Sequence, residues 1–129
     1  MHSPTTSASL RRGQRALATV IAALVLLQGV SAGRAVYGPW DIEVHGWIGN
    51  GLFVLVVANL ALAIVRRAPN DELTVAALLG GLTFAQVGLG YVGRAELEAA
   101  AWHIPNGVLL MALATYQLAL LQLRASAGR

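Results

Sequence analysis

Apolar residues dominate four long stretches of this chain, at residues 16–32, 46–65, 73–92 and 99–123. A helix of about 20 apolar residues is long enough to cross the hydrocarbon core of a bilayer. The first stretch is slightly shorter than this, and the other three reach it. Because the connections between the stretches are short, the pattern predicts an all-α membrane protein whose four transmembrane helices form one bundle.

A helical period places polar residues and glycines on one face of the second and fourth stretches. The second stretch carries His45, Gly49, Leu52, Val56, Asn59 and Ala63 on this face, and the fourth carries His103, Gly107, Leu110, Ala114, Gln117 and Leu121. An amide exposed to lipid is costly, so we expect Asn59 and Gln117 to point into the bundle. There they can bond each other across a two-fold axis.

The two halves of the chain match each other when residue numbers are shifted by 58. The matched pairs include Gln28 with Gln86, His45 with His103, Gly49 with Gly107, Asn59 with Gln117, and Arg66 with Arg124. Internal similarity at a fixed spacing indicates a repeated structural unit. We therefore expect a transmembrane domain over residues 13–125, built from two-helix units at about 13–67 and 71–125.

The N-terminal region allows two interpretations. Three arginines followed by an apolar run and the letters VSAGRA also describe a cleavable secretory signal. The match between Gln28 and Gln86 favours a retained first helix. Residues 1–12 lack a core-forming pattern, and we expect them to be a disordered tail.

Composition supports a membrane protein, because 57% of the residues are hydrophobic and 12% are charged, against about a quarter charged in soluble domains. Seven of the nine basic residues fall at the termini or between the second and third stretches: Arg11, Arg12, Arg15, Arg66, Arg67, Arg124 and Arg129. This bias predicts that both termini are cytoplasmic, in a bacterial inner membrane. The net charge of +3 then reflects topology, and no nucleic-acid partner is expected.

His45 and His103 are the candidate metal ligands. Both are expected near the outer leaflet, one to two turns inside helices that run in the same direction. Haem iron accepts axial imidazoles, and four-helix bundles build cofactor sites from facing helices. The chain has no cysteine, so covalent c-type attachment is excluded. The pattern predicts one haem b per chain, although hydrogen bonding between helices also accounts for such histidines.

Other residues are candidates for contacts with the cofactor. Gly49 and Gly107 leave room for a flat group against the helix, although helix packing also explains membrane glycines. Arg34 and Arg94 suit the haem propionates or serve as interfacial anchors. Gln28 and Gln86 can bridge helices, hold a propionate or bind a quinone headgroup.

Two features concern the ends and interior of the helices. Asp71 and Glu72 are expected to begin the third helix, with Asn70 or Asp71 as its cap. Pro105 should bend the fourth helix. On this interpretation no carboxylate lies inside a span.

Three segments resemble one half of haem A synthase: EVHGWIGNGLFVLVVANLALAIVRR, LTFAQVGLGYVGR and AAAWHIPNGVLLMALATYQLALL. A closer resemblance is to small uncharacterised actinobacterial four-helix membrane proteins with His-Gly-x-Asn-like motifs. The likeness covers residues 16–123 and implies a ligand role for His45 and His103. Haem A synthase has two such halves, and its catalytic glutamate just before a histidine is not cleanly reproduced here, since Ile42 stands three residues before His45 and Glu43 stands two before. Haem A synthesis by this chain alone is therefore not expected.

These observations predict a single-haem b-type membrane cytochrome that passes electrons, with a quinol or a respiratory complex as partner. If it is an enzyme, it is a haem-dependent membrane oxidoreductase. The alternatives are a non-haem accessory subunit of a membrane complex, or a small transporter acting as a homodimer. Because proton-coupled transporters usually carry a carboxylate within a span, the transporter is the least favoured.

Overall fold

The computed structural model describes the backbone of residues 4–127 and the side chains of residues 8–127. The described chain forms four α-helices: α1 Pro4–Tyr37, α2 Ile42–Val65, α3 Asn70–Val92 and α4 Leu97–Ala127. Each contains a segment long and apolar enough to cross a membrane. The all-helical, four-span prediction is therefore confirmed, and the chain is a multi-pass membrane protein.

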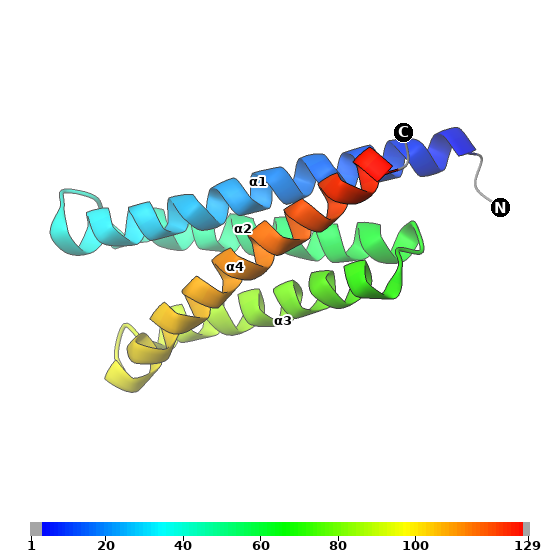
Figure 1. The fold of residues 1–129 in the computed structure, drawn as a ribbon. Helices are drawn as coiled ribbons and strands as arrows, with labels where there is room; N and C mark the ends of the chain where they lie inside the picture. The colour runs from blue at the N-terminus through cyan, green and yellow to red at the C-terminus, as the bar shows by residue number, and fades with distance from the viewer. Residues whose placement is uncertain (1–3, 128–129) are drawn as a thin grey trace.

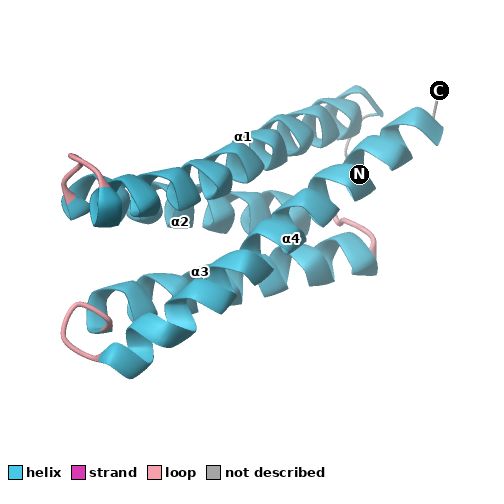
Figure 2. Ribbon diagram, turned by 60° about the vertical axis from the view of Figure 1, so that its left-hand side comes forward, coloured by secondary structure: helices cyan, strands magenta, loops and turns pink. Residues whose placement is uncertain are grey.

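The helices form two hairpins, α1–α2 and α3–α4, joined by the loop at 66–69 (Figure 1). Each helix packs on two neighbours, so α2 and α4 face each other across the bundle. The loops at 38–41 and 93–96 lie at one end, which we call the histidine end, and the two hairpins diverge there in both views (Figures 1 and 2). The opposite end, called the termini end, carries the 66–69 loop, and there α4 crosses over α1 (Figure 1).

The buried faces of α2 and α4 coincide with the predicted stripes. The buried residues are Leu52, Val56, Asn59 and Ala63 in α2, and Leu110, Ala114, Gln117 and Leu121 in α4. Leu52, Val56, Leu110 and Ala114 join Ile21, Val25 and Leu79 in the apolar core. Many large apolar residues elsewhere on the helices are exposed. The residues buried between the helices therefore include small and polar residues as well as apolar ones.

Local hydrogen bonds explain where α2 begins and ends. The side chain of Asp41 accepts a bond from the Glu43 amide at 2.9 Å, which caps the first turn. At the other end, Arg67 takes a left-handed conformation with φ 54°. The Arg67 amide donates to the Ile64 carbonyl and the Ala68 amide donates to the Ala63 carbonyl, both at 2.9 Å. This pair of bonds is a Schellman motif, and it stops the helix before Pro69.

Two helix ends differ from the sequence-based expectations. The helix α1 begins at Pro4, whereas residues 1–12 were expected to be a disordered tail, and residues 1–3 lie outside the described chain. Pro4 is compatible with this start, because proline is well tolerated in the first turn of a helix. The helix α1 therefore begins before the apolar stretch at residues 16–32. The N-cap of α3 is Pro69, without a side-chain cap bond. The prediction of Asn70 or Asp71 as that cap is therefore wrong.

Polar side chains from all four helices meet near the termini end. We call this set the amide–arginine network, which comprises Gln14, Asn59, Arg66, Glu72, Gln117 and Arg124. The Asn59 amide donates to Gln117 Oε1 at 3.1 Å, as the sequence predicted. Gln14 donates a bond from Nε2 to Asn59 Oδ1 at 3.4 Å, and its Oε1 accepts a bond from the Arg66 guanidinium.

Glu72 is the buried carboxylate of this network, with 4% of its surface exposed. It forms ion pairs with Arg66 and, at 2.7 Å, with Arg124. Burial, followed by the nearby charges of Arg11 and Arg124, lowers the pKa of the Arg66 guanidinium. The sequence placed Glu72 just before the apolar stretch at 73–92 and did not indicate its burial, which the pairing with two arginines allows in the first turn of α3.

Candidate functional site

His45 and His103 approach each other between the diagonal helices α2 and α4. The centres of their rings are 6.0 Å apart and the ring planes are inclined by 68°. A metal bound by one nitrogen of each ring at about 2 Å would place the two ring centres about 6 Å apart. The separation of the ring centres matches this length, and both ring nitrogens of His103 are directed at Gln86 of α3.

The His103 ring is held on both sides by Gln86 of α3. Its Nδ1 lies 3.1 Å from the Gln86 carbonyl oxygen, and its Nε2 lies 3.1 Å from the Gln86 amide nitrogen. An amide nitrogen only donates, so Nε2 accepts and Nδ1 carries the proton. Asn106 donates to Gln86 Oε1 at 2.6 Å, which fixes the orientation of this amide.

His45 has a different environment. Its Nδ1 lies 3.0 Å from the hydroxyl oxygen of Ser31, which also lies within hydrogen-bond distance of the Gln28 carbonyl oxygen and of Gln28 Oε1. When Nδ1 carries the proton it donates to Ser31, and Nε2 is then available as a metal ligand. Within the described chain, this Nε2 has no amide partner like that of His103.

The two glycines one turn after the histidines face the two glutamines. A Cβ atom on Gly49 would lie 2.7 Å from Gln28 Nε2, and one on Gly107 would lie 3.1 Å from Gln86 Nε2. The glycines leave space beside the helix, as the sequence predicted. The Gln28 side chain occupies the space beside Gly49, and the Gln86 side chain occupies the space beside Gly107. A third glycine, Gly90, lies against the edge of the His103 ring.

The guanidinium groups of the two arginines at the histidine end lie beside glycines. Arg94 extends from the 93–96 loop toward the start of α2, where its guanidinium reaches Gly46, the residue after His45. Its Cζ lies 5.3 Å from the centre of the Tyr91 ring. Arg34 folds back along the end of α1 against Gly38. Arg94 is thus beside the histidine level, whereas Arg34 remains with its own helix.

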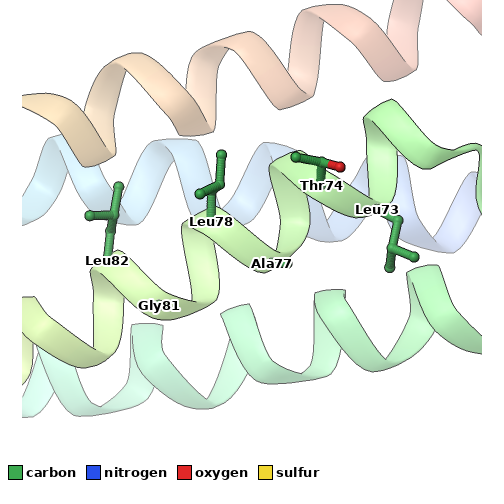
Figure 3. Close-up of a pocket in the computed structure, with 6 residues that line it drawn as sticks. All are labelled: Leu73, Thr74, Ala77, Leu78, Gly81 and Leu82. Atoms are coloured by element: carbon green, nitrogen blue, oxygen red, sulfur yellow. The ribbon is translucent and has the colours of Figure 1, made fainter.

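Two surface hollows do not include the histidines. One is an open apolar groove on the outer face of α3 (Figure 3), lined by Leu73, Thr74, Ala77, Leu78, Gly81 and Leu82. The other lies between α2 and α3 at the histidine end, lined by Glu43, Gly46, Trp47, Asn50, Tyr91 and Arg94. Since neither contains a histidine, the candidate site remains the space between the two rings.

Ser31 and Asn106 belong to the site, although the sequence did not single them out as candidates. Ser31 follows Gln28 by three residues, and Asn106 follows His103 by three. Residues three apart share a helix face, so a polar residue one turn from a candidate ligand was the available signal. The sequence does not show which of many such neighbours makes contact.

Replacing Gly90 with alanine should destabilise the protein. The new Cβ would lie 3.0 Å from His103 Cε1, and the ring cannot retreat easily because Gln86 bonds both of its nitrogens. Overpacking of this kind costs about 1–3 kcal/mol. The measurement is the free energy of unfolding in detergent micelles. The control is Gly88→Ala, where nothing lies within 4 Å, and equal stability of the two variants would contradict the packing around His103.

Comparisons with protein-family models, with curated proteins and with solved structures give no match to this chain. The resemblance to haem A synthase and to the small actinobacterial membrane proteins therefore stays a prediction. The functional case depends on the geometry around His45 and His103.

Proposed function

We propose that the chain is a b-type membrane cytochrome that holds one haem b between His45 and His103 and transfers electrons. The observation that carries this proposal is the 6.0 Å separation of two imidazole rings that come from diagonally opposed helices. Facing helices of a four-helix bundle are a common framework for such cofactor sites.

The residues around the rings fit haem better than they fit a bare metal ion. Among the described residues, no group of three or more histidine, cysteine, aspartate or glutamate side chains could hold a metal. A site with two protein ligands suits a metal whose other ligands belong to a macrocycle. The space beside Gly49 is filled by the Gln28 side chain and the space beside Gly107 by the Gln86 side chain, so a haem would have to displace both, and Gln86 would first lose its bonds to His103 and Asn106.

Each candidate residue then has a role. His45 and His103 bind the cofactor, and Gly49 and Gly107 keep the adjacent helix surface flat. Arg94, which lies beside Gly46, is the better placed of the two arginines for a propionate, and Arg34 would have to swing from the end of α1. Haem supplies reversible one-electron oxidation and reduction, and its potential depends on the axial ligands.

The cytochrome would be a product of gene duplication with two-helix units at about 13–67 and 71–125. In support, Gln28 lies against Gly49 as Gln86 lies against Gly107. The arginine bias places both termini in the cytoplasm of a bacterial cell. The histidine end would then lie near the outer leaflet. A membrane quinol, a respiratory complex or a second copy of the chain is the expected partner.

A non-haem accessory subunit is the second candidate function. It is favoured by the hydrogen bonds of Gln86 to both nitrogens of His103, because a purely structural histidine is satisfied in this way. The transporter is a third candidate. Glu72 is a buried carboxylate at the start of α3, but Arg66 and Arg124 already neutralise its charge.

The absorption spectrum of the purified protein tests the proposal. Protein produced with an adequate haem supply should show a sharp Soret band, and pyridine-haem analysis should give one haem b per chain. A colourless protein of full stability would instead support the accessory subunit. Substrate-dependent proton uptake into vesicles would support the transporter.

A further inference from the structure

The hollow between α2 and α3 at the histidine end, which we call the α2–α3 hollow, is a site separate from the two histidines. It has a volume of about 220 Å³. Its lining residues come from one face of α2, the last turn of α3 and the 93–96 loop: Glu43, Gly46, Trp47, Asn50, Tyr91 and Arg94. Because pockets for drug-sized ligands measure about 300–1,000 Å³, this hollow suits a smaller polar group.

The α2–α3 hollow carries two opposite charges that are not paired with each other. Arg94 and Glu43 both line it, whereas the ion pairs of the described chain all involve Arg66 or Arg124. The Arg94 guanidinium lies over the Tyr91 ring instead, with Cζ 5.3 Å from the ring centre. Both charges are therefore available to a ligand, and the ligand that complements them carries one charge of each sign.

A hydroxyl group in the α2–α3 hollow adds a second donor for an anion. Asn50 Nδ2 donates to the Tyr91 hydroxyl oxygen at 2.8 Å, so the hydroxyl proton remains to be donated to another group. Among the described residues this proton has no acceptor. The Arg94 guanidinium has a planar fork of donors that binds two phosphate oxygens at once. Phosphate is therefore the anion that these donors suit.

An apolar surface continues from the α2–α3 hollow toward the middle of the bundle. Phe53 follows Asn50 by three residues and Phe84 precedes Tyr91 by seven, so each phenylalanine shares a helix side with a residue of the hollow. The centres of the two phenyl rings lie 6.3 Å apart, and Phe84 is 71% exposed. A molecule with a polar head and hydrocarbon chains can place its head in the hollow and its chains on these rings.

We propose that the α2–α3 hollow binds the headgroup of a zwitterionic membrane phospholipid that carries a phosphate and a primary ammonium, as phosphoethanolamine does. Arg94 and the Tyr91 hydroxyl hold the phosphate, and the Glu43 carboxylate accepts hydrogen bonds from the ammonium. Trp47, which is 70% exposed, lies where tryptophan contacts headgroups. A choline headgroup has no proton to donate to Glu43, and an anionic headgroup has no positive charge to offer it, so both bind more weakly.

This lipid site does not rest on the proposed haem, because neither histidine lines the α2–α3 hollow. The two proposals share only the Arg94 guanidinium, which is also the better placed arginine for a propionate. A bound headgroup and a haem propionate compete for this group.

Quenching of Trp47 fluorescence by brominated lipids tests the proposal. The full-length protein with Trp40→Phe and Trp102→Phe keeps Trp47 as its only tryptophan, and it is reconstituted into vesicles of phosphocholine lipid. Increasing fractions of this lipid are replaced by one that is brominated near the glycerol end of its chains and carries a phosphoethanolamine, phosphocholine or phosphoglycerol headgroup. We expect the ethanolamine lipid to associate about fivefold more tightly than the choline lipid, the weight of one charged contact at a membrane surface.

Two variants separate the contacts of the phosphate from those of the ammonium. Arg94→Gln should lower the association of the ethanolamine and choline lipids together, by about fivefold. Glu43→Gln should leave the choline lipid unchanged and remove the preference for ethanolamine. Arg34→Gln and Glu96→Gln are the matched controls, because both residues lie at the histidine end and neither lines the hollow. All these side chains are exposed, so the variants should fold, and the controls should keep the preference.

Several results would overturn the lipid site. These are equal association of all the brominated lipids, a preference for the phosphoglycerol lipid, and a preference that persists in both Arg94→Gln and Glu43→Gln. Displacement of the lipid by soluble phosphoethanolamine would show that the chains are not part of the ligand, which also overturns the proposal. A protein that takes up no haem and keeps the preference would overturn the cytochrome and support the lipid site, and a protein that holds haem without the preference would do the reverse.

Discussion

Replacing Glu72 with alanine should lower the free energy of unfolding by about 3–5 kcal/mol. Arg66 is buried beside Glu72, with 6% of its side chain exposed, and its other hydrogen-bond partner is Gln14. Without the carboxylate, the Arg66 guanidinium keeps its charge in a place that water does not reach. The hairpins meet at this end of the bundle (Figure 1), so the loss should affect the whole fold. Chemical unfolding in detergent micelles measures it.

Asp71 provides the matched control. It also pairs with Arg124, but its side chain is 48% exposed, and removal of such a pair costs about 1 kcal/mol or less. Glu72→Gln keeps a hydrogen-bond acceptor and should fall between Glu72→Ala and Asp71→Ala. If Glu72→Ala is no less stable than Asp71→Ala, the amide–arginine network does not hold the termini end together.

The second large effect concerns the proposed ligands. His45→Ala should reduce haem affinity by about 100-fold or more, because even loss of a residue that only supports a metal ligand costs about 10–100-fold. His103→Ala should reduce it by at least about tenfold, and less than His45→Ala, because Gln86 already competes for His103. Haem titration of the purified apoprotein, followed at the Soret band, measures both affinities.

Trp102→Phe is the control for the histidine variants. Trp102 precedes His103 and bonds the exposed Glu98 at 2.8 Å on the outside of the bundle. Its replacement should leave haem affinity unchanged. Equal affinity of the unchanged protein, His45→Ala and His103→Ala would exclude these two residues as ligands, and any haem bound would then be held elsewhere.

The helices and their buried faces could be predicted from the sequence because both depend on local periodicity. Gly49 and Asn59 follow His45 by 4 and 14 residues, and a helix places such residues on one side. The bond between Asn59 and Gln117 could be foreseen for a related reason. An amide in lipid must find a partner, and each of these helices offered one amide at the same depth.

The environment of Glu72 could not be predicted in this way. A glutamate in the first turn of a helix usually faces water and the positive end of the helix dipole, and the sequence indicated only that Glu72 lies in this turn. Its burial depends on Arg66 of the 66–69 loop and on Arg124 of α4. The Gln86 cover of His103 is a similar case, since it requires α3 and α4 to pack with their residues in register.

By itself the sequence determined four spans, the face that each of α2 and α4 buries, and the placement of one histidine on each of those faces. These properties follow from hydrophobic length and helical period, which act within a single segment. Only the tertiary structure decided that the two rings lie 6.0 Å apart, that one is covered by an amide, and that a carboxylate is buried between arginines. Those outcomes depend on how separate helices pack and pair their polar groups, and no single segment contains that information.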